Sequence, residues 1–184
     1  MHKLITSTIA VAFGLLLCAP ALAQDDEASA EEQISGTYTL SVPQKKARAS
    51  INQKIEDLVD DMNFVKRPFA RSSLKGTTEP CGKLTLEFPS DEVSVKCHGK
   101  PVTVSPDDGT QAPYKSDDGE TYQVRQEMKG KALTQFFRGE DGTRTNTYTL
   151  SDGGDTLNLA VKIESDQLPR PLTYKLSFKR ASSK

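Results

Sequence analysis

From Cys81 onward the chain is divided into short alternating runs by turn-forming residues, and this rhythm constrains the fold more than any other feature. Runs such as "KLTLEF", "VSVKC", "ETYQVRQEM" and "TLNLAVKI" place apolar side chains at every second position. Asp-Gly and Gly-rich segments such as "GEDG" and "SDGGD" separate them, which is typical of β-hairpins. The pattern predicts a mainly β, antiparallel up-and-down meander of about eight or nine strands. Closing this sheet into a barrel would remove its unpaired edges.

One segment near the start of the domain has a helical period instead. The run "GTYTLSV", residues 36–42, alternates and predicts a first strand. A single apolar stripe then predicts one amphipathic helix over residues 47–66, capped by Ser50 and stopped before Pro68. The stripe consists of Ile51, Ile55, Leu58, Val59, Met62 and Val65. For the segment "RPFARSSLK", a second, short helical turn before Gly76 is an alternative.

The N-terminus predicts export. A basic residue, Lys3, precedes an apolar run from Ile9 to Cys18, and "ALA" at residues 21–23 fits a signal-peptidase site. We expect a signal peptide over residues 1–23, an acidic disordered leader over 24–34, one domain over 35–181 and a short tail over 182–184. Lipidation at Cys18 is an alternative that the bulky Leu17 disfavours. The predicted location is the periplasm or the exterior of a Gram-negative bacterium.

The remaining cysteines, Cys81 and Cys97, predict a disulfide. They are an even pair 16 positions apart in an exported chain, and closing such a loop stabilises a fold by roughly 3 kcal/mol. A zinc site that uses both cysteines and His98 is the alternative. It lacks a nearby fourth ligand and CxxC spacing.

Charge and composition exclude several functional classes. The chain has 24 Lys and Arg residues against 25 Asp and Glu residues, and this balance argues against nucleic-acid binding. His98 is the single histidine after the leader, and no GxSxG motif accompanies it, so we predict no enzyme and no cofactor. The adjacent Asp60 and Asp61 point about 100° apart on a helix, which disfavours a shared metal. Turn formation explains the Asp-rich loops without calcium.

The order of a strand, a helical segment and a long meander resembles the calycins, the group of lipocalins and fatty-acid-binding proteins. The run "SGTYTL", residues 35–40, resembles the Gly-x-Trp motif of the first lipocalin strand, with Tyr38 in the tryptophan position. In lipocalins a late basic residue packs over that ring, and Arg180 is the corresponding residue here. A helical insertion after the first strand is similar to the fatty-acid-binding proteins, in which two short helices form a lid. The chain lacks tryptophan, and the basic and tyrosine carboxylate ligands of those proteins have no clear match.

A second resemblance covers the C-terminal part. The run "YTLSDGGDTLNLAVKIESDQLPRPLTYKLSFKR", from Tyr148 to Arg180, resembles small secreted proteins of Gram-negative bacteria with lipocalin-like barrels and uncharacterised function. It implies a fold and a compartment rather than an activity.

Two groups of residues are predicted to contact a ligand. If Tyr148 faces the barrel interior, the strand period places Arg144 and Asn146 on the same face, and Gln126 shares a face with Val124 and Met128. Tyr174 faces inward on the last strand. For Arg144 the alternative is a solvated position directly after a turn.

The second group lies in the helical segment. Phe64, Phe69, Arg67 and Arg71 are predicted to form a basic, aromatic cluster with Lys66 and Lys75 that guides an anionic amphiphile or touches a membrane surface. The alternative is that both phenylalanines pack against the barrel rim.

The sequence therefore predicts an exported, non-enzymatic β-barrel that binds a small, partly apolar ligand such as a fatty acid. A protein-binding or inhibitor module with a side-chain-filled barrel is the alternative. A continuous cavity under the helix would favour the first. Filling of the barrel by Phe136, Phe137, Tyr148, Tyr174 and Phe178 would favour the second. The oligomeric state is left open.

Overall fold

The computed structural model describes residues 28–117 and 119–181 of the 184-residue chain. The predicted signal peptide, residues 24–27 of the predicted leader and the tail 182–184 lie outside these ranges. Three helices and ten strands are described. They are α1 (Ala30–Ile34), β1 (Gly36–Leu40), α2 (Gln44–Val59), α3 (Arg67–Thr77), β2 (Lys83–Glu87), β3 (Glu92–Cys97), β4 (Thr103–Pro106), β5 (Ala112–Lys115), β6 (Thr121–Lys129), β7 (Ala132–Arg138), β8 (Thr143–Leu150), β9 (Thr156–Glu164) and β10 (Leu172–Arg180).

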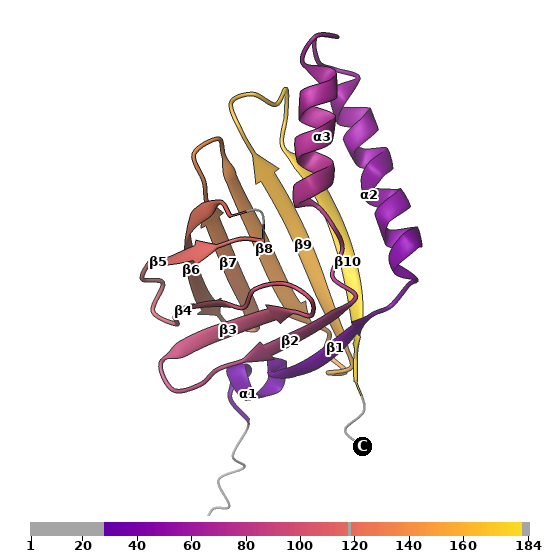
Figure 1. Ribbon diagram of the computed structural model, residues 1–184. Helices are drawn as coiled ribbons and strands as arrows, with labels where there is room; N and C mark the ends of the chain where they lie inside the picture. The colour runs from indigo at the N-terminus through magenta and orange to yellow at the C-terminus, as the bar shows by residue number, and fades with distance from the viewer. Residues whose placement is uncertain (1–27, 118, 182–184) are drawn as a thin grey trace, which may run out of the picture.

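All ten strands form one antiparallel sheet that curves into a nearly closed barrel (Figure 1). The order β4-β3-β2-β1-β10-β9-β8-β7-β6-β5 places two strands that are consecutive in sequence, β4 and β5, at the two edges. An isolated bridge joins Asp108, in the segment after β4, to Glu127 on β6. The predicted mainly β meander is confirmed. The strand count exceeds the predicted eight or nine because the irregular, proline-containing stretch after Asp108 contains β5, which gains its pairing from β6.

Two helices stand between β1 and β2 where the sequence predicted one helix over residues 47–66. The helix α2 begins at Gln44 with Pro43 in the N-cap position, so Ser50 lies inside the helix and caps nothing. It ends at Val59, before the last residue of the predicted stripe, Val65, which is exposed. Pro68 does not stop a helix but lies in the first turn of α3, where a missing N–H costs no hydrogen bond.

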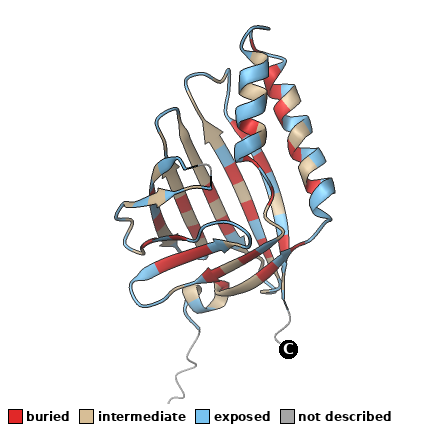
Figure 2. Ribbon diagram, in the orientation of Figure 1, coloured by how far each residue is buried: buried red, intermediate tan, exposed pale blue. Residues whose placement is uncertain are grey.

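The helices α2 and α3 form a hairpin, and α2 packs along β10 at one end of the barrel (Figure 1). Its buried face is the predicted stripe as far as Met62, and it joins the barrel side chains in one hydrophobic core. Figure 2 shows this face buried, whereas the rest of the hairpin is mostly exposed or intermediate. The α2–α3 turn is the part of the hairpin furthest from α1 (Figure 1). None of the described helices is long and apolar enough to span a bilayer.

The opposite end of the barrel is closed by α1 and a clamp around Arg180. The guanidinium of Arg180 lies 4.8 Å from the centre of the Tyr38 ring, as the lipocalin resemblance implied. It donates to the carbonyl oxygens of Gln33, Ser35 (2.6 Å) and Gly154 (3.0 Å), which fastens the end of α1 to the sheet. At Gly36 (φ 138°) a Cβ would lie 2.7 Å from the Arg180 Nη1, so glycine is required there.

The disordered leader predicted over residues 24–34 is wrong for its second half. Residues 30–34 form α1, whose Ser29 and Glu32 make a capping box, and Ile34 is buried in the core. The Tyr38 hydroxyl donates to the Ile34 carbonyl oxygen at 2.7 Å, and burial raises the pKa of Tyr38. The leader was predicted from its acidic composition, which does not reveal an apolar anchor such as Ile34.

The predicted disulfide between Cys81 and Cys97 is present, with the two Cα atoms 5.6 Å apart. It joins the segment that follows α3 to the end of β3. Nearby, the Gln44 side chain donates to the Pro80 carbonyl oxygen at 2.8 Å. The base of the α2–α3 hairpin is therefore fixed at the points where the chain enters and leaves it.

Candidate functional site

The predicted ligand-binding residues separate into two groups in space. Gln126, Arg144, Tyr148 and Tyr174 face the barrel interior, whereas Phe64, Arg67, Phe69 and Arg71 belong to the α2–α3 hairpin. We call the first group, with the residues that bond to it, the interior polar chain, and we call Phe64, Val65 and Phe69 the hairpin tip.

The interior polar chain is a continuous set of hydrogen bonds across the barrel. The Gln135 Nε2 donates to the Gln126 Oε1 at 2.9 Å, and the Asn146 Nδ2 donates to the Gln135 Oε1 at 2.9 Å. The Tyr148 hydroxyl donates to that same Gln135 oxygen at 3.1 Å. All four side chains are buried. Since a buried polar group is costly without a partner, their mutual satisfaction makes this arrangement stable without a ligand.

One end of the chain fastens the barrel seam. The Gln126 Nε2 donates to the Val93 carbonyl oxygen at 2.7 Å and to the Ser105 Oγ at 3.2 Å. Gln126 lies on β6, near one edge of the sheet, whereas these acceptors lie on β3 and β4 near the other edge. Gln126 therefore links strands that share no backbone ladder with β6.

The other end of the chain reaches the helices. The Arg144 Nε donates to the Asn146 Oδ1 at 2.9 Å, and its Nη1 donates to the carbonyl oxygen of Thr77, the last residue of α3, at 2.8 Å. Arg144 is therefore bonded to the protein on both sides, although its side chain is only half-buried. Its charge has no carboxylate within ion-pair distance among the described residues.

Burial affects the protonation of Tyr148 in the interior polar chain. Loss of hydration raises the pKa of Tyr148 to about 12, although the nearby Arg144 charge opposes this shift. The phenol therefore stays protonated and continues to donate its hydrogen bond at physiological pH.

The barrel interior is filled by its own side chains. Fourteen inward-facing residues across the sheet have at most 9% of their surface exposed, namely Tyr38, Leu40, Leu84, Leu86, Val93, Val95, Val124, Leu133, Leu157, Leu159, Val161, Leu172, Tyr174 and Phe178. Side chains that lined a large cavity would keep accessible surface, and these do not.

The aromatic residues expected to fill the barrel do so only in part. Tyr148, Tyr174 and Phe178 are buried in the interior. Phe137 is half-buried on the same face of the sheet, in edge contact with Tyr114 at 5.7 Å between ring centres. Phe136 lies on the outer face, where the Arg125 guanidinium covers its ring at 5.0 Å.

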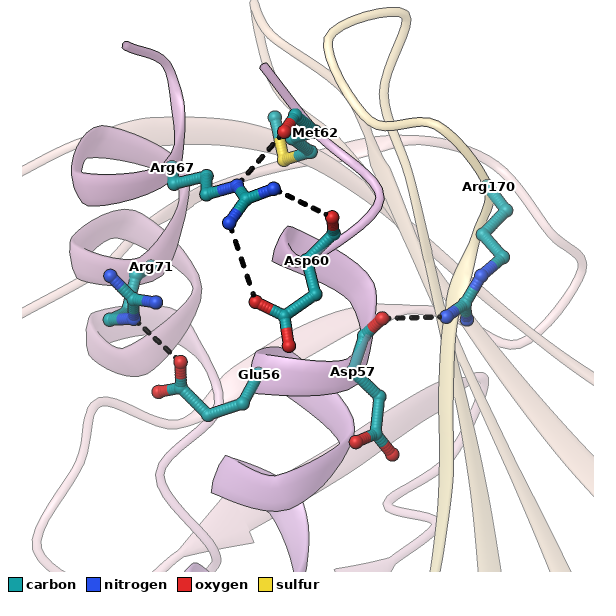
Figure 3. A network of polar contacts seen from close by, with 7 residues as sticks. All are labelled: Glu56, Asp57, Asp60, Met62, Arg67, Arg71 and Arg170. Atoms are coloured by element: carbon teal, nitrogen blue, oxygen red, sulfur yellow. Dashed lines mark hydrogen bonds and ion pairs between the residues drawn. The ribbon is translucent and has the colours of Figure 1, made fainter. Parts of the chain in front are cut away.

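Three basic residues of the hairpin, Arg67, Arg71 and Lys75, form ion pairs with acids at the end of α2, two of which Figure 3 shows. The Glu56 carboxylate accepts from the Arg71 Nε at 2.7 Å and from the Lys75 Nζ at 2.9 Å. Arg67 pairs with Asp60 at 3.7 Å and also donates to the Met62 carbonyl oxygen at 2.9 Å. Arg67, Arg71 and Lys75 of the predicted basic cluster therefore link α3 to the end of α2, whereas Lys66 has no ion pair with a described residue.

The paired aspartates have structural partners as well. The Arg170 Nε lies 3.1 Å from an Asp61 carboxylate oxygen. The Arg170 Nη2 donates to the Asp57 carbonyl oxygen at 3.0 Å, a contact that Figure 3 shows. These contacts tie the β9–β10 loop to the end of α2. No group of three potential metal ligands exists in the described ranges. His98 is exposed and bonds to the Thr85 hydroxyl at 3.1 Å.

The hairpin tip, by contrast, has no partner in the core. Phe64, Val65 and Phe69 have 77%, 58% and 76% of their surface exposed. The alternative that both phenylalanines pack against the barrel rim is therefore wrong. An open groove of about 570 Å³ adjoins the tip, between the α2–α3 turn and the β9–β10 loop. It is lined by Met62, Asn63, Val65, Lys66, Asp166, Gln167, Leu168 and Pro169.

Sequence reasoning missed parts of both regions. The strand period of "ALTQFFR" places Gln135 with Leu133 and Phe137 and could have revealed it as an interior residue. The groove could not have been found this way, because Leu168 and Pro169 come from a loop about a hundred residues after Met62. A smaller hollow of about 260 Å³ beside α1 and Arg180 was also not predicted.

Comparisons with known proteins support the fold. No protein-family model and no curated protein matches the sequence. A fatty acid binding protein from Schistosoma mansoni, solved with arachidonic acid, has a TM-score of 0.52 at 18% identity over 84% of this chain and 100% of that chain. Lipid binding protein 8 of Caenorhabditis elegans in its apo form has a TM-score of 0.50 at 11% identity, over 81% of this chain and 96% of that chain.

A third similar structure is an abundant heat soluble (SAHS) protein from Ramazzottius varieornatus. It has a TM-score of 0.53 at 9% identity, over 81% of this chain and 96% of that chain. The three likenesses confirm the predicted calycin-like barrel fold. At these identities they establish the fold alone.

Proposed function

We propose that this chain is an exported, non-enzymatic barrel that binds a small, partly apolar ligand, such as a fatty acid, at its helical end. The observation that carries the proposal is the hairpin tip. Large apolar side chains there are exposed beside a groove, while the barrel interior is filled. Exposed aromatics on an otherwise polar surface are a cost that binding a ligand would offset.

The groove has suitable dimensions and chemistry. Its volume lies within the roughly 300–1,000 Å³ range of ligand sites. Met62, Val65, Leu168 and Pro169 supply apolar surface, and Lys66 supplies a positive charge that forms no ion pair with the described residues. We propose that Lys66 meets the acid group of the ligand, with Phe64 and Phe69 against its chain.

The other predicted site residues have a supporting role in this proposal. Arg67 and Arg71 hold the hairpin together, and Gln126, Arg144, Tyr148 and Tyr174 maintain the filled barrel on which it stands. Export is supported by the signal-peptide pattern of residues 1–23 and by the disulfide. The proposal of a non-enzymatic role rests on the lack of a nucleophile–histidine motif in the sequence.

Oleate titration followed by native mass spectrometry tests this function on protein purified from the exported fraction. We expect a 1:1 complex, and an affinity roughly tenfold lower for the F64S/F69S variant because two apolar contacts are lost. The V102S/V104S variant, which removes exposed apolar surface elsewhere, should bind normally. Equal binding by all three proteins, or none by the wild type, would contradict the proposal.

The filled interior favours a second candidate, a protein-binding or inhibitor module of the cell envelope. Small barrels are often packed solid, and the hairpin tip would then be the contact surface. This candidate predicts no lipid in solvent extracts of the purified protein and no response to oleate.

A further inference from the structure

Four lysines gather on the outer wall of the barrel, on a surface separate from the hairpin tip. Lys175 and Lys179 lie on β10, Lys83 on β2 and Lys96 on β3. The strand order places β1 between β10 and β2, so these four strands are neighbours. Inward-facing residues such as Tyr174, Phe178 and Leu84 alternate with them, and all four lysines are exposed. We call this surface the lysine wall.

The register brings these charges together. Lys179 and Lys83 both pair with Thr39 on the strand between them, which separates their Cα atoms by about 10 Å. Lys96 pairs with Thr85, two residues along β2 from Lys83. Lys175 lies four residues from Lys179 on the same face of β10, about 13 Å along the strand.

The lysine wall forms no ion pair within the described part of the chain. None of its four amines lies within ion-pair distance of an acid in the described ranges, whereas Lys75, Lys100, Lys129 and Lys162 all have such partners. The side chains between the lysines are neutral and hydroxylated, namely Thr37, Thr39, Thr85 and Ser177. The nearest acids on these strands, Glu87 and Glu92, lie toward the β2–β3 turn.

We propose that the lysine wall docks the protein on an anionic phospholipid bilayer. Lysines are compact charges that suit a diffuse layer of phosphates, and hydroxyl groups between them can donate to phosphate oxygens. The wall carries no exposed aromatic or arginine side chain, the types that dominate protein interfaces and base stacking. The inference is independent of the proposed ligand site, because it concerns a different surface.

Vesicle co-sedimentation tests the inference. The wild-type protein should bind phosphatidylcholine vesicles that contain phosphatidylglycerol and should not bind pure phosphatidylcholine, and added salt should weaken the binding. Since each lysine near an anionic surface contributes roughly a fivefold factor, the K83Q/K179Q variant should partition roughly 25-fold less. All substituted side chains are exposed, and circular dichroism checks that the fold is retained.

A matched control separates this surface from total charge. The K129Q/K162Q variant loses the same two charges at lysines that already have carboxylate partners, so its vesicle binding should be nearly unchanged. Equal loss in both variants, or equal binding to both vesicle types, would overturn the inference. So would tight binding of the wild type to heparin without binding to anionic vesicles, since the wall would then recognise soluble polyanions. Oleate titration of K83Q/K179Q should match the wild type, so failure of one proposal does not affect the other.

Discussion

The barrel interior buries polar side chains, whereas the hairpin tip exposes apolar ones. In the interior, polar side chains are buried and each hydrogen-bonds to another, as Gln126, Gln135 and Asn146 do. At the tip, apolar side chains are exposed, and Arg67 and Arg71 behind them are paired with acids, whereas Lys66 beside them is not paired with a described residue. The interior is therefore complete without a ligand, whereas the tip leaves apolar surface unburied. This difference locates the expected binding function outside the barrel, although the fold is one in which ligands are usually sought inside.

Breaking the interior polar chain should have the largest effect on stability. Gln135→Leu removes the group that bonds to Gln126, Asn146 and Tyr148 and leaves buried donors and acceptors unpaired. We expect the free energy of unfolding to fall by about 3–5 kcal/mol, measured by urea denaturation. Gln123→Leu, on the exposed face of β6, is the control and should change it by less than about 0.5 kcal/mol. A small loss of stability in Gln135→Leu would mean that the hydrogen bonds of the interior polar chain contribute little to the free energy of unfolding.

Releasing the base of the hairpin should have the next largest effect. The C81S/C97S variant removes the cross-link between the segment after α3 and β3. We expect a loss of about 3 kcal/mol in the free energy of unfolding, because the unfolded chain regains the freedom of a loop of this size. Dithiothreitol should destabilise the wild type by a similar amount and leave the variant unaffected. If dithiothreitol left the free energy of unfolding of the wild-type protein unchanged, the structural role of the disulfide would be contradicted.

The hairpin tip should show the reverse pattern. Phe64→Ser removes an exposed ring that packs against nothing in the core, so the free energy of unfolding should change by less than about 0.5 kcal/mol. Its effect should instead appear in oleate affinity. A large loss of stability would show that Phe64 packs against the protein in solution and that the tip is part of the core.

The smallest expected effect is a pH dependence confined to the hairpin. Hydrogen bonds from Lys75 and Arg71 lower the pKa of Glu56, so the charged carboxylate stabilises the folded state at neutral pH. A depressed pKa means that this contribution is present above the pKa of the unfolded chain and is lost as the pH falls through the folded value. When observed rates are divided by the intrinsic exchange rate at each pH, amide exchange in α3 should therefore become faster as the pH falls below about 4.

Glu56→Gln should remove most of this pH dependence. The interior offers the contrast, since the pKa of Tyr148 at about 12 keeps its proton in place over the same range. If amide exchange in β7 and β8 accelerated as much as in α3, acid would be loosening the whole fold rather than the hairpin.

The sequence revealed local periods well and long-range partners poorly. Alternation correctly placed Gln126, Arg144 and Tyr148 on the inner face, because a side chain's face follows from strand geometry alone. The lipocalin-like motif correctly paired Tyr38 with Arg180 across the whole chain. Composition around Arg67 and Arg71 suggested a free basic cluster, whereas their partners are Asp60, at the C-cap of the preceding helix, and Glu56 within it. Such pairing depends on the α2–α3 turn, which the single predicted helix did not contain.

The same limit explains why the sequence did not predict the lysine wall. Lys83, Lys96, Lys175 and Lys179 are scattered over almost a hundred residues, and only the register through β1 brings them together. The groove likewise depends on the approach of the β9–β10 loop to the end of α2, which Arg170 secures.

Photolabelling with a diazirine-bearing fatty acid, mapped by peptide mass spectrometry, tests most directly whether the binding site lies outside the barrel. We predict labels in residues 62–69 and 166–169, which surround the groove, and a loss of these labels in the F64S/F69S variant. Labels concentrated in residues 144–150 and 172–178 would place the ligand among the interior side chains. That result would contradict the view that the barrel is filled by the protein itself.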